Sequence, residues 1–352
     1  MIVNIQRHGG KIGIFVAVIL SLVCVYFIRN LSASEVFVQS ASPYEYREET
    51  VASVPLLFTG DIMLGRYVET LMNRYGQNYP FGSTTEFLKS HTTIANLEGS
   101  IPKVHIPTKI NTMVFSFPPE TPTILKNNGI QAVSLANNHS LDSGAVGYEE
   151  TKRSLENGGI VHFGGYSTTL TEHFETHLGT TSVVVYGINM ISSTWDKEMA
   201  YSATELLRKQ YPKSILIAQL HWGNEYALTQ GDEQRVLAHK LIDRGVDVIV
   251  GSHPHVVQGI EVYKGTPIFY SLGNFIFDQY FSQDVERGYL LFLDKKDGEI
   301  LYTIIPVVSR RSQVAFPSER IKNEILETIA KSSDASLKKN INESEILLPF
   351  LR

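Results

Sequence analysis

The chain has 352 residues, of which 43% are hydrophobic and 19% are charged, with a formal net charge of −5 and one cysteine, Cys24. This composition is typical of a globular protein with a sizeable core, and it argues against intrinsic disorder and against nucleic acid as the main partner. A single cysteine excludes an internal disulfide and a thiolate cluster, so any metal would need ligands from His, Asp, Glu or Asn.

The N-terminus predicts a membrane anchor. Residues 12–28 form an unbroken run of apolar or small residues, with two basic residues before it and a third directly after it. The run is near the lower length limit for crossing a bilayer, and positive charge ahead of it predicts the N-terminus inside and the rest outside. We expect a single-pass anchor in residues 1–30 and a polar linker over 31–53. Cleavage as a signal peptide is the alternative, because Ser32-Ala33-Ser34 offers small residues after the run.

Two short apolar segments are followed by a carboxylate. Residues 54–59 and 93–97 have the pattern of buried strands and lead to Asp61 and Glu98. A carboxylate at the end of a buried strand is costly unless it is paired or bound to a ligand. A helix cap is the alternative for Asp61, since Arg66 to Tyr75 has a helical pattern. Either acid alone would be weak support, so the repetition of the pattern carries the inference.

Three further predicted strands are followed by amide and imidazole side chains. The strands 132–136, 214–220 and 246–250 lead to Asn137-Asn138-His139, to His221, and to His253-Pro254-His255. Asparagine pairs also form turns, and loop histidines also hydrogen-bond carbonyl groups, so each motif alone has a structural alternative. Because α/β sheets place their ligands at the carboxyl ends of strands, we expect these side chains to meet at one sheet edge.

The remaining patterns define the predicted domain. Helical patterns and strand patterns alternate up to the loop of His253, and two hairpins are expected after it, at 259–271 and 288–308. From Ser318 onward the chain is polar and helix-leaning, which predicts a peripheral or partly disordered tail. We therefore expect one α/β domain over 54–310 and a C-terminal tail over 311–352.

The polar residues at the strand ends point to metal chemistry. Carboxylates and imidazoles that converge on one sheet edge, with one carboxylate shared, form a site for two divalent cations. Mixed nitrogen and oxygen ligation suits Mn, Fe or Zn better than Ca or Mg.

Six segments together resemble one known family. They are Gly60–Arg66, Asn96–Glu98, Asn137–His139, His221–Glu225, Gly251–His255 and Ser271–Phe275. In this order they resemble the CapA family of capsule, or poly-γ-glutamate, biosynthesis proteins, within the calcineurin-like metallophosphoesterase superfamily. The resemblance implies a four-layer α/β/β/α sandwich and a membrane-anchored protein that faces outward, in the periplasm or outside the cell.

The resemblance also implies residue roles. Asp61, Glu98 and His255 would hold one cation, and Glu98, with Asn138, His221 and His253, would hold the other. His139 would lie near the leaving group and, with Asp61, would be catalytic. We expect the following residues to orient ligands or to contact substrate: Arg66, Asn137, Glu225, Glu261 and Asn274.

Two residues depart from the superfamily pattern. The first motif is Asp-x-His in the superfamily, and Met63 stands in the histidine position here. A thioether is a poor ligand for hard cations, so the first cation loses a ligand. We therefore expect either a one-metal site or an altered two-metal site. The bridging carboxylate is Glu98 rather than aspartate.

Three functions compete. The first is a subunit for making or exporting an anionic γ-glutamate polymer, with metal-assisted hydrolysis or transfer of γ-glutamyl amide bonds and proton donation by His139. Polymer-synthase subunits are possible partners. The second is an extracytoplasmic metallophosphoesterase that acts on a phosphate ester. The third is a polymer-binding scaffold with a degraded metal site, which Met63 favours.

Overall fold

The structure is a computed structural model, and it describes residues 54–166, 172–192, 196–296 and 298–349. Within these ranges no helix is both long and apolar enough to cross a bilayer. The predicted anchor in residues 1–30 and the linker over 31–53 lie outside the described residues.

One sheet of the described residues has nine strands. These are β1 Leu56–Ile62, β2 Thr92–Leu97, β3 Ile130–Ser134, β4 Val161–Phe163, β11 Asn274–Ile276, β12 Arg287–Lys296, β13 Glu299–Arg310, β14 Gln313–Ala315 and β15 Glu345–Pro349. Seven strands lie in the order β14-β13-β12-β1-β2-β3-β4, while β11 pairs with β1 and β15 pairs with β13. Strands β1 to β4 run parallel, so their carboxyl ends meet at one edge.

The second sheet has six described strands. These are β5 His173–Leu178, β6 Thr181–Asn189, β7 Ile215–His221, β8 Val248–Ser252, β9 Ile260–Tyr263 and β10 Thr266–Phe269. Their order is β5-β6-β7-β8-β10-β9, with β6, β7 and β8 parallel. Both predicted hairpins are confirmed, as β9–β10 and as β12–β13.

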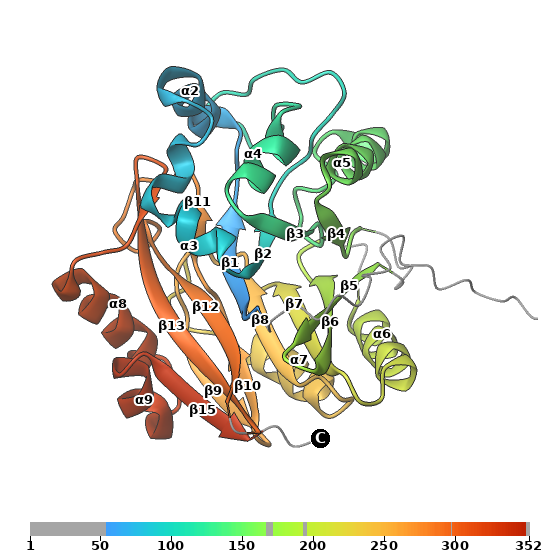
Figure 1. The fold of residues 1–352 in the computed structure, drawn as a ribbon, viewed down its shortest axis with the longest axis vertical. Coiled ribbons are helices and arrows are strands. Elements are labelled where there is room, and N and C mark those ends of the chain that lie inside the picture. Colours follow the sequence, from blue (N-terminus) through green and yellow to red (C-terminus); the bar gives the residue numbers. More distant parts are fainter. Residues whose placement is uncertain (1–53, 167–171, 193–195, 297, 350–352) are drawn as a thin grey trace, which may run out of the picture. The chain divides into compact units, whose positions relative to one another are not determined.

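Helices lie against both sheets. They are α2 Arg66–Tyr75, α3 Thr85–Lys89, α4 Thr121–Asn127, α5 Gly144–Gly158, α6 Lys197–Gln210, α7 Asp232–Ile242, α8 Glu319–Lys331 and α9 Lys338–Asn342, with short 3-10 turns at Tyr79–Thr84 and Ala335–Leu337. Figure 1 shows α6 and α7 beside the second sheet, and α8 and α9 alongside β13 and β15.

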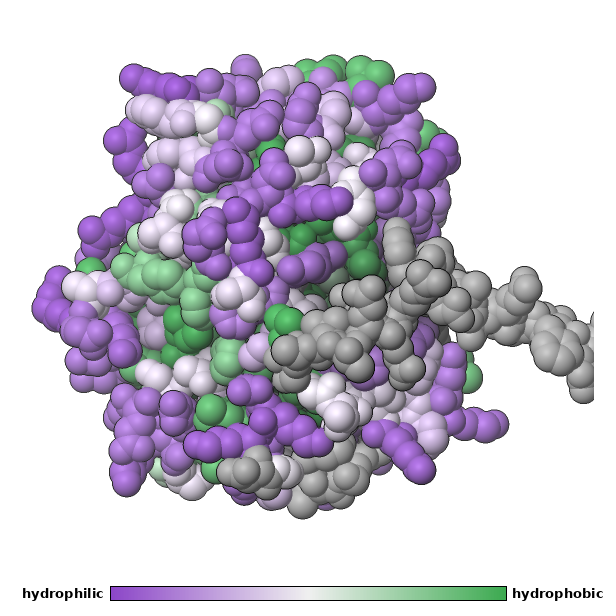
Figure 2. Space-filling model, viewed as in Figure 1, coloured by the Kyte–Doolittle hydropathy of each residue, from purple (hydrophilic) through white to green (hydrophobic). Residues whose placement is uncertain are grey.

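Three apolar clusters define the layers. One joins the facing sides of the two sheets, for example Phe58 and Ile94 with Val185 and Ile217. A second lies between the first sheet and α2 to α5, and a third lies between the second sheet and α6 and α7. Helices therefore cover the outer faces of two stacked sheets, a mixed α/β fold. On the face seen in Figure 2, hydrophilic side chains predominate and hydrophobic ones form small patches between them.

The C-terminal stretch is more than a peripheral tail. The helix expected after Ser318 is present as α8, but its residues Ile325, Leu326 and Ile329 are buried in the cluster between the sheets. Strand β15 then extends the first sheet along β13. The expectation of a peripheral, partly disordered segment is therefore wrong for residues 319–349.

Candidate metal centre

Donor side chains from both sheets meet at the carboxyl ends of their strands. Asp61 is the second-last residue of β1, Glu98 directly follows β2, and His221 is the last residue of β7. One ligand atom of each lies within 4.8 Å of the others, and all three side chains are buried. The predicted convergence is therefore present, and it lies between the two sheets rather than along one of them.

Gly60 lets the strands approach closely enough for this convergence. A Cβ atom at Gly60 would overlap the Gly273 carbonyl, so only glycine fits between β1 and the chain before β11. This contact brings Asp61 into register with Asn274.

Glu98 lies at the centre of the cluster. Neither carboxylate oxygen has a hydrogen-bond partner among the described residues, although the side chain is fully buried. The Nε2 atoms of His139, His221 and His255 lie 3.9, 4.0 and 3.9 Å from Glu98 Oε1. Burial raises the pKa of Glu98 well above its usual value, despite the opposing charge of His255. A buried carboxylate without a donor is strongly disfavoured unless a cation or proton compensates it.

Asp61 is held by three groups. Asn96 donates to its Oδ1 at 2.7 Å, the backbone N–H of His253 donates to Oδ2 at 3.2 Å, and His255 Nδ1 lies 3.4 Å from Oδ2. Sequence reasoning missed Asn96, which also lies 3.3 Å from His221 Nδ1 and so connects the two sheets.

His221 Nε2 meets two of the predicted ligands. It lies 2.7 Å from Asn138 Oδ1 and 3.1 Å from His253 Nδ1, while its own Nδ1 is 3.1 Å from Ser252 Oγ. Burial, and then the neighbouring His253, lower the pKa of His221 well below its usual value. A neutral imidazole is the form that binds metals.

The short contacts thus divide the donors into two groups that share Glu98. His255 lies beside Asp61, whereas Asn138, His221 and His253 lie together.

The loop after β8 holds its two histidines in unusual backbone conformations. His253 and His255 have φ angles of 96° and 59°, which are rare for residues other than glycine. Burial, and then the charge of His255, lower the pKa of His253 to about 4. Burial opposes the charged form of His255, but the carboxylates of Glu98 and Asp61 raise its pKa to about 9.

His139 is oriented by two neighbours that sequence reasoning did not select. Its Nδ1 lies 2.8 Å from Asp142 Oδ2, and its ring stacks on Phe115 with 3.7 Å between centroids. Its Nε2 therefore faces Glu98 and the donor cluster. The spacing His-x-x-Asp was the available signal for Asp142.

Three of the predicted supporting residues lie at the cluster. Ligand atoms of Glu225, His253 and His255 lie within 4.8 Å of one another. Asn274 Oδ1 lies 2.9 Å from His255 Nδ1, and Asn137 Oδ1 accepts from the backbone N–H of His139 at 3.1 Å. Glu261 instead contacts His239 Nε2 at 2.5 Å and accepts from the Tyr270 hydroxyl at 2.8 Å. These contacts place Glu261 outside the cluster.

Arg66 is engaged by the protein itself. It forms a buried ion pair with Asp278, donates to the Thr112 carbonyl at 3.2 Å, and lies over the Phe115 ring at 4.6 Å. The guanidinium therefore holds Phe115, the ring that stacks on His139, in place. A substrate anion would have to compete with Asp278 for Arg66.

Met63 contributes no ligand atom to the cluster. Its sulfur accepts from the Gly65 backbone N–H at 3.2 Å, and its side chain packs in the apolar cluster between the first sheet and its helices.

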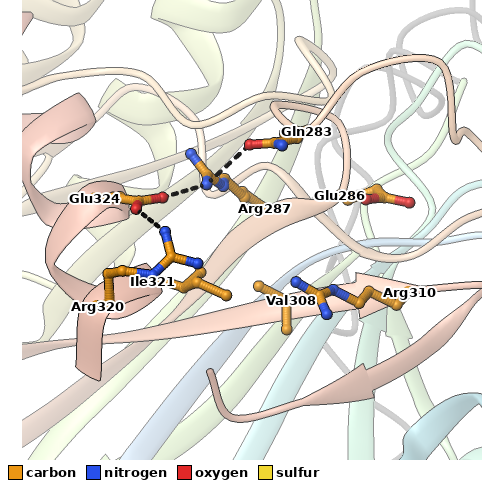
Figure 3. Close-up of a pocket in the computed structure, with 8 residues that line it drawn as sticks. All are labelled: Gln283, Glu286, Arg287, Val308, Arg310, Arg320, Ile321 and Glu324. Carbon is orange, nitrogen blue, oxygen red and sulfur yellow. Dashed lines mark hydrogen bonds and ion pairs between the residues drawn. The ribbon is translucent and has the colours of Figure 1, made fainter. Parts of the chain in front are cut away.

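A separate polar cavity of about 230 Å³ lies where β12, β13 and α8 meet. Figure 3 shows Glu324 between Arg287 and Arg320, with Gln283 also bonded to Arg287. The carboxylate of Glu324 forms ion pairs with both arginines. None of the predicted site residues lines this cavity.

The donor set of the cluster fits divalent cations. The two orphaned oxygens of buried Glu98, the three imidazole nitrogens about them and the Asp61 carboxylate are the mixed ligands that Zn, Mn and Fe accept. The cluster could therefore hold a metal ion.

The chain is similar to capsule proteins along most of its length. Residues 55–279 match the family described as "Bacterial capsule synthesis protein PGA_cap". "Capsule biosynthesis protein CapA" of Bacillus anthracis is 28% identical over 358 residues, covering 95% of this chain and 85% of that protein. "PGA biosynthesis protein CapA" of Bacillus subtilis (strain 168) is 31% identical over 281 residues, covering 71% and 70%. A "probable polyglutamine synthesis accessory protein" of Mycobacterium tuberculosis is 23% identical, covering 80% and 91%.

The family match includes every residue of the donor cluster, from Asp61 to Asn274, and it confirms the resemblance read from the motifs. The chain therefore belongs to the PGA_cap, or CapA, family of bacterial capsule synthesis proteins.

Proposed function

We propose that this protein takes part in making or exporting a capsule polymer of γ-linked glutamate. The family match over residues 55–279 and the names of the two Bacillus relatives support this role. The polymer is polyanionic, and a divalent cation held by the donor cluster would attract its carboxylates.

We further propose that residues 1–30 anchor the chain in the membrane and that the folded domain after them acts outside the cytoplasm, where a capsule is assembled. Support comes from the apolar run 12–28 and the basic residues ahead of it. A protease-protection experiment on sealed protoplasts tests this placement: added protease should digest the domain on the outer face of the membrane, and full protection would contradict it.

The donor cluster is proposed as the centre of a metal-dependent hydrolase or transferase that acts on γ-glutamyl amide bonds. The observation that carries this proposal is buried Glu98, whose two oxygens lack donors while three imidazoles surround it. One or two bound Mn, Zn or Fe ions would supply Lewis-acid polarisation of the amide carbonyl and activation of water. Asp61, Glu98 and His255 would hold one ion, and Asn138, His221 and His253 would share Glu98 in holding the other.

His139 is proposed as the proton donor. Asp142 at 2.8 Å fixes the ring and its tautomer, and Phe115 stacks on one face, so that Nε2 is directed at the cluster. When water adds to the γ-carbonyl carbon and the C–N bond breaks, His139, protonated on both ring nitrogens, would give its Nε2 proton to the departing amine and keep the Nδ1 proton bonded to Asp142. Asn137 accepts from the His139 backbone N–H and so helps to position the residue. The Arg66–Asp278 pair lies against Phe115, which stacks on the His139 ring.

Incubation of the full chain with poly-γ-glutamate and Mn²⁺ or Zn²⁺ tests the proposal, with chain length followed by size-exclusion chromatography. We expect cleavage or transfer that EDTA abolishes and that His253→Ala removes. The matched control is His177→Ala, which changes an exposed histidine on β5. Full activity of the His253→Ala and Asp61→Ala proteins would refute a role for the cluster.

The same geometry favours a second candidate, a phosphate esterase. Carboxylate and imidazole donors around one buried glutamate are also the kind of ligand set that the metallophosphoesterase resemblance implies. A generic phosphodiester in a parallel assay separates the two. Turnover of the diester without polymer cleavage favours the esterase. A metal-free protein that binds polymer without cleaving it favours a scaffold.

A further inference from the structure

The Met63 position leaves one cation short of a ligand. The sulfur of Met63 is bonded to the Gly65 backbone and packed among apolar residues, so it cannot serve in place of a histidine. On the proposed assignment, the cation beside Asp61 and His255 then has three protein ligands, with Glu98 shared. Any further ligand must come from another part of the chain.

Glu225 lies next to this incomplete set. One of its carboxylate oxygens and one nitrogen each of His253 and His255 lie within 4.8 Å of one another. The two histidines are buried, whereas Glu225 is exposed and so approaches the cluster from the solvent side. His255 also contacts Asp61 and Glu98, so Glu225 lies beside the set of ligands that is one short.

The backbone holds Glu225 in this place. The next residue, Tyr226, has a φ of 63°, and its N–H donates to the Pro254 carbonyl at 2.8 Å, which ties this loop to the loop of the two histidines. The Tyr226 hydroxyl also bonds to Glu225, and Tyr226 lies 6.1 Å from the His255 ring.

We propose that Glu225 is a direct metal ligand, which supplies to the Asp61–Glu98–His255 cation the coordination that Met63 does not. An imidazole nitrogen together with carboxylate oxygens is a common ligand combination for Zn, Mn and Fe. Glu225 also adds a third carboxylate to Asp61 and Glu98, which better balances two divalent cations. The inference rests on the proposed metal centre and changes its ligand set.

The test compares Glu225→Gln with wild type in the full chain, by titration calorimetry with Mn²⁺ and by elemental analysis after dialysis. We expect wild type to bind two equivalents, and Glu225→Gln to bind one of them at least about tenfold more weakly, since even indirect partners of ligands are worth about 10–100-fold in affinity. Glu233→Gln, which changes an exposed glutamate at the start of α7, is the matched control and should behave as wild type.

A second variant distinguishes ligation from charge. Both variants remove the negative charge, but Glu225→His offers an imidazole nitrogen in place of the weaker amide oxygen of Glu225→Gln. A ligand role therefore predicts that Glu225→His restores part of the Mn²⁺ binding lost in Glu225→Gln. Equal loss in Glu225→His and Glu225→Gln would overturn direct ligation, as would wild-type affinity for both equivalents in Glu225→Gln. Absence of metal binding in wild type would instead refute the metal centre itself.

Discussion

Replacement of Glu98 by glutamine should remove most of the stability that a divalent cation gives this protein. Wild-type Glu98 is fully buried, its oxygens have no donors within the part of the chain that the structure describes, and burial raises its pKa. Each buried polar group left unsatisfied costs about 1–3 kcal/mol, and a bound cation would relieve this cost. The amide keeps the shape of the side chain but removes the charge shared by both cations.

The size of the effect follows from mass action. A cation at 100 times its dissociation constant stabilises the folded state by about 2.7 kcal/mol. For a domain of about 300 residues, with an entropy of unfolding of about 0.6 kcal/mol/K, that corresponds to a rise in Tm of roughly 4 °C. Glu98→Gln should gain only a small part of this rise.

Thermal unfolding followed by circular dichroism, with EDTA-treated protein before and after addition of Mn²⁺, measures the shift. His177→Gln, on the surface of β5, is the control and should shift as wild type does. An equal Tm gain in Glu98→Gln and wild type would refute the reasoning, since the cation would then be bound elsewhere.

Three further predictions follow from the same contacts. Because the pKa of His255 is raised to about 9, the residue is charged at pH 7 and must lose its proton to bind a cation. Cation affinity should therefore rise from pH 7 to 9, and calorimetry in buffers of different ionisation enthalpy should detect about one proton released at pH 7; no release would contradict this. His139→Gln should lower kcat for polymer cleavage by about 100-fold or more with metal content unchanged, and loss of metal instead would make His139 a ligand. Arg66→Met should destabilise the fold by about 3–5 kcal/mol in urea unfolding, because it leaves Asp278 buried and unpaired, and Asp278→Leu in the same chain should recover part of the loss.

Much of the site could be predicted because its residues follow apolar strands. A β-branched run such as 246–250 is visible locally, and the residues after it must emerge at the sheet edge. That rule located Asp61, Glu98, His221 and His253 without any knowledge of their distances. It could not show that two sheets, rather than one, contribute them, because strand order depends on contacts remote in sequence.

Residues that act through others were harder to find. Asn96 lies inside β2, in a position that looks like an interior strand residue, and its bond to Asp61 exists only because β1 and β2 are neighbours. Glu261 shows the opposite case. It is close to His255 in sequence, but β9 carries it to the far edge of the second sheet, where it contacts His239.

The C-terminal helix is correctly predicted, but its burial is not, because the prediction relied on the average polarity of the segment rather than on the spacing of its apolar residues. The sequence of α8 is mostly polar, yet Ile325, Leu326 and Ile329 lie on one face and are buried. Spacings of three and four residues are the pattern of an amphipathic helix, which packs on a core whatever its mean polarity.

The measurement closest to the central claim is anomalous diffraction from crystals of the full chain grown with Mn²⁺. The structure predicts anomalous peaks beside Glu98, one near Asp61 and His255 and one near His221 and His253. Crystals that take up Mn²⁺ elsewhere, or show no peak within coordination distance of Glu98, would contradict the account.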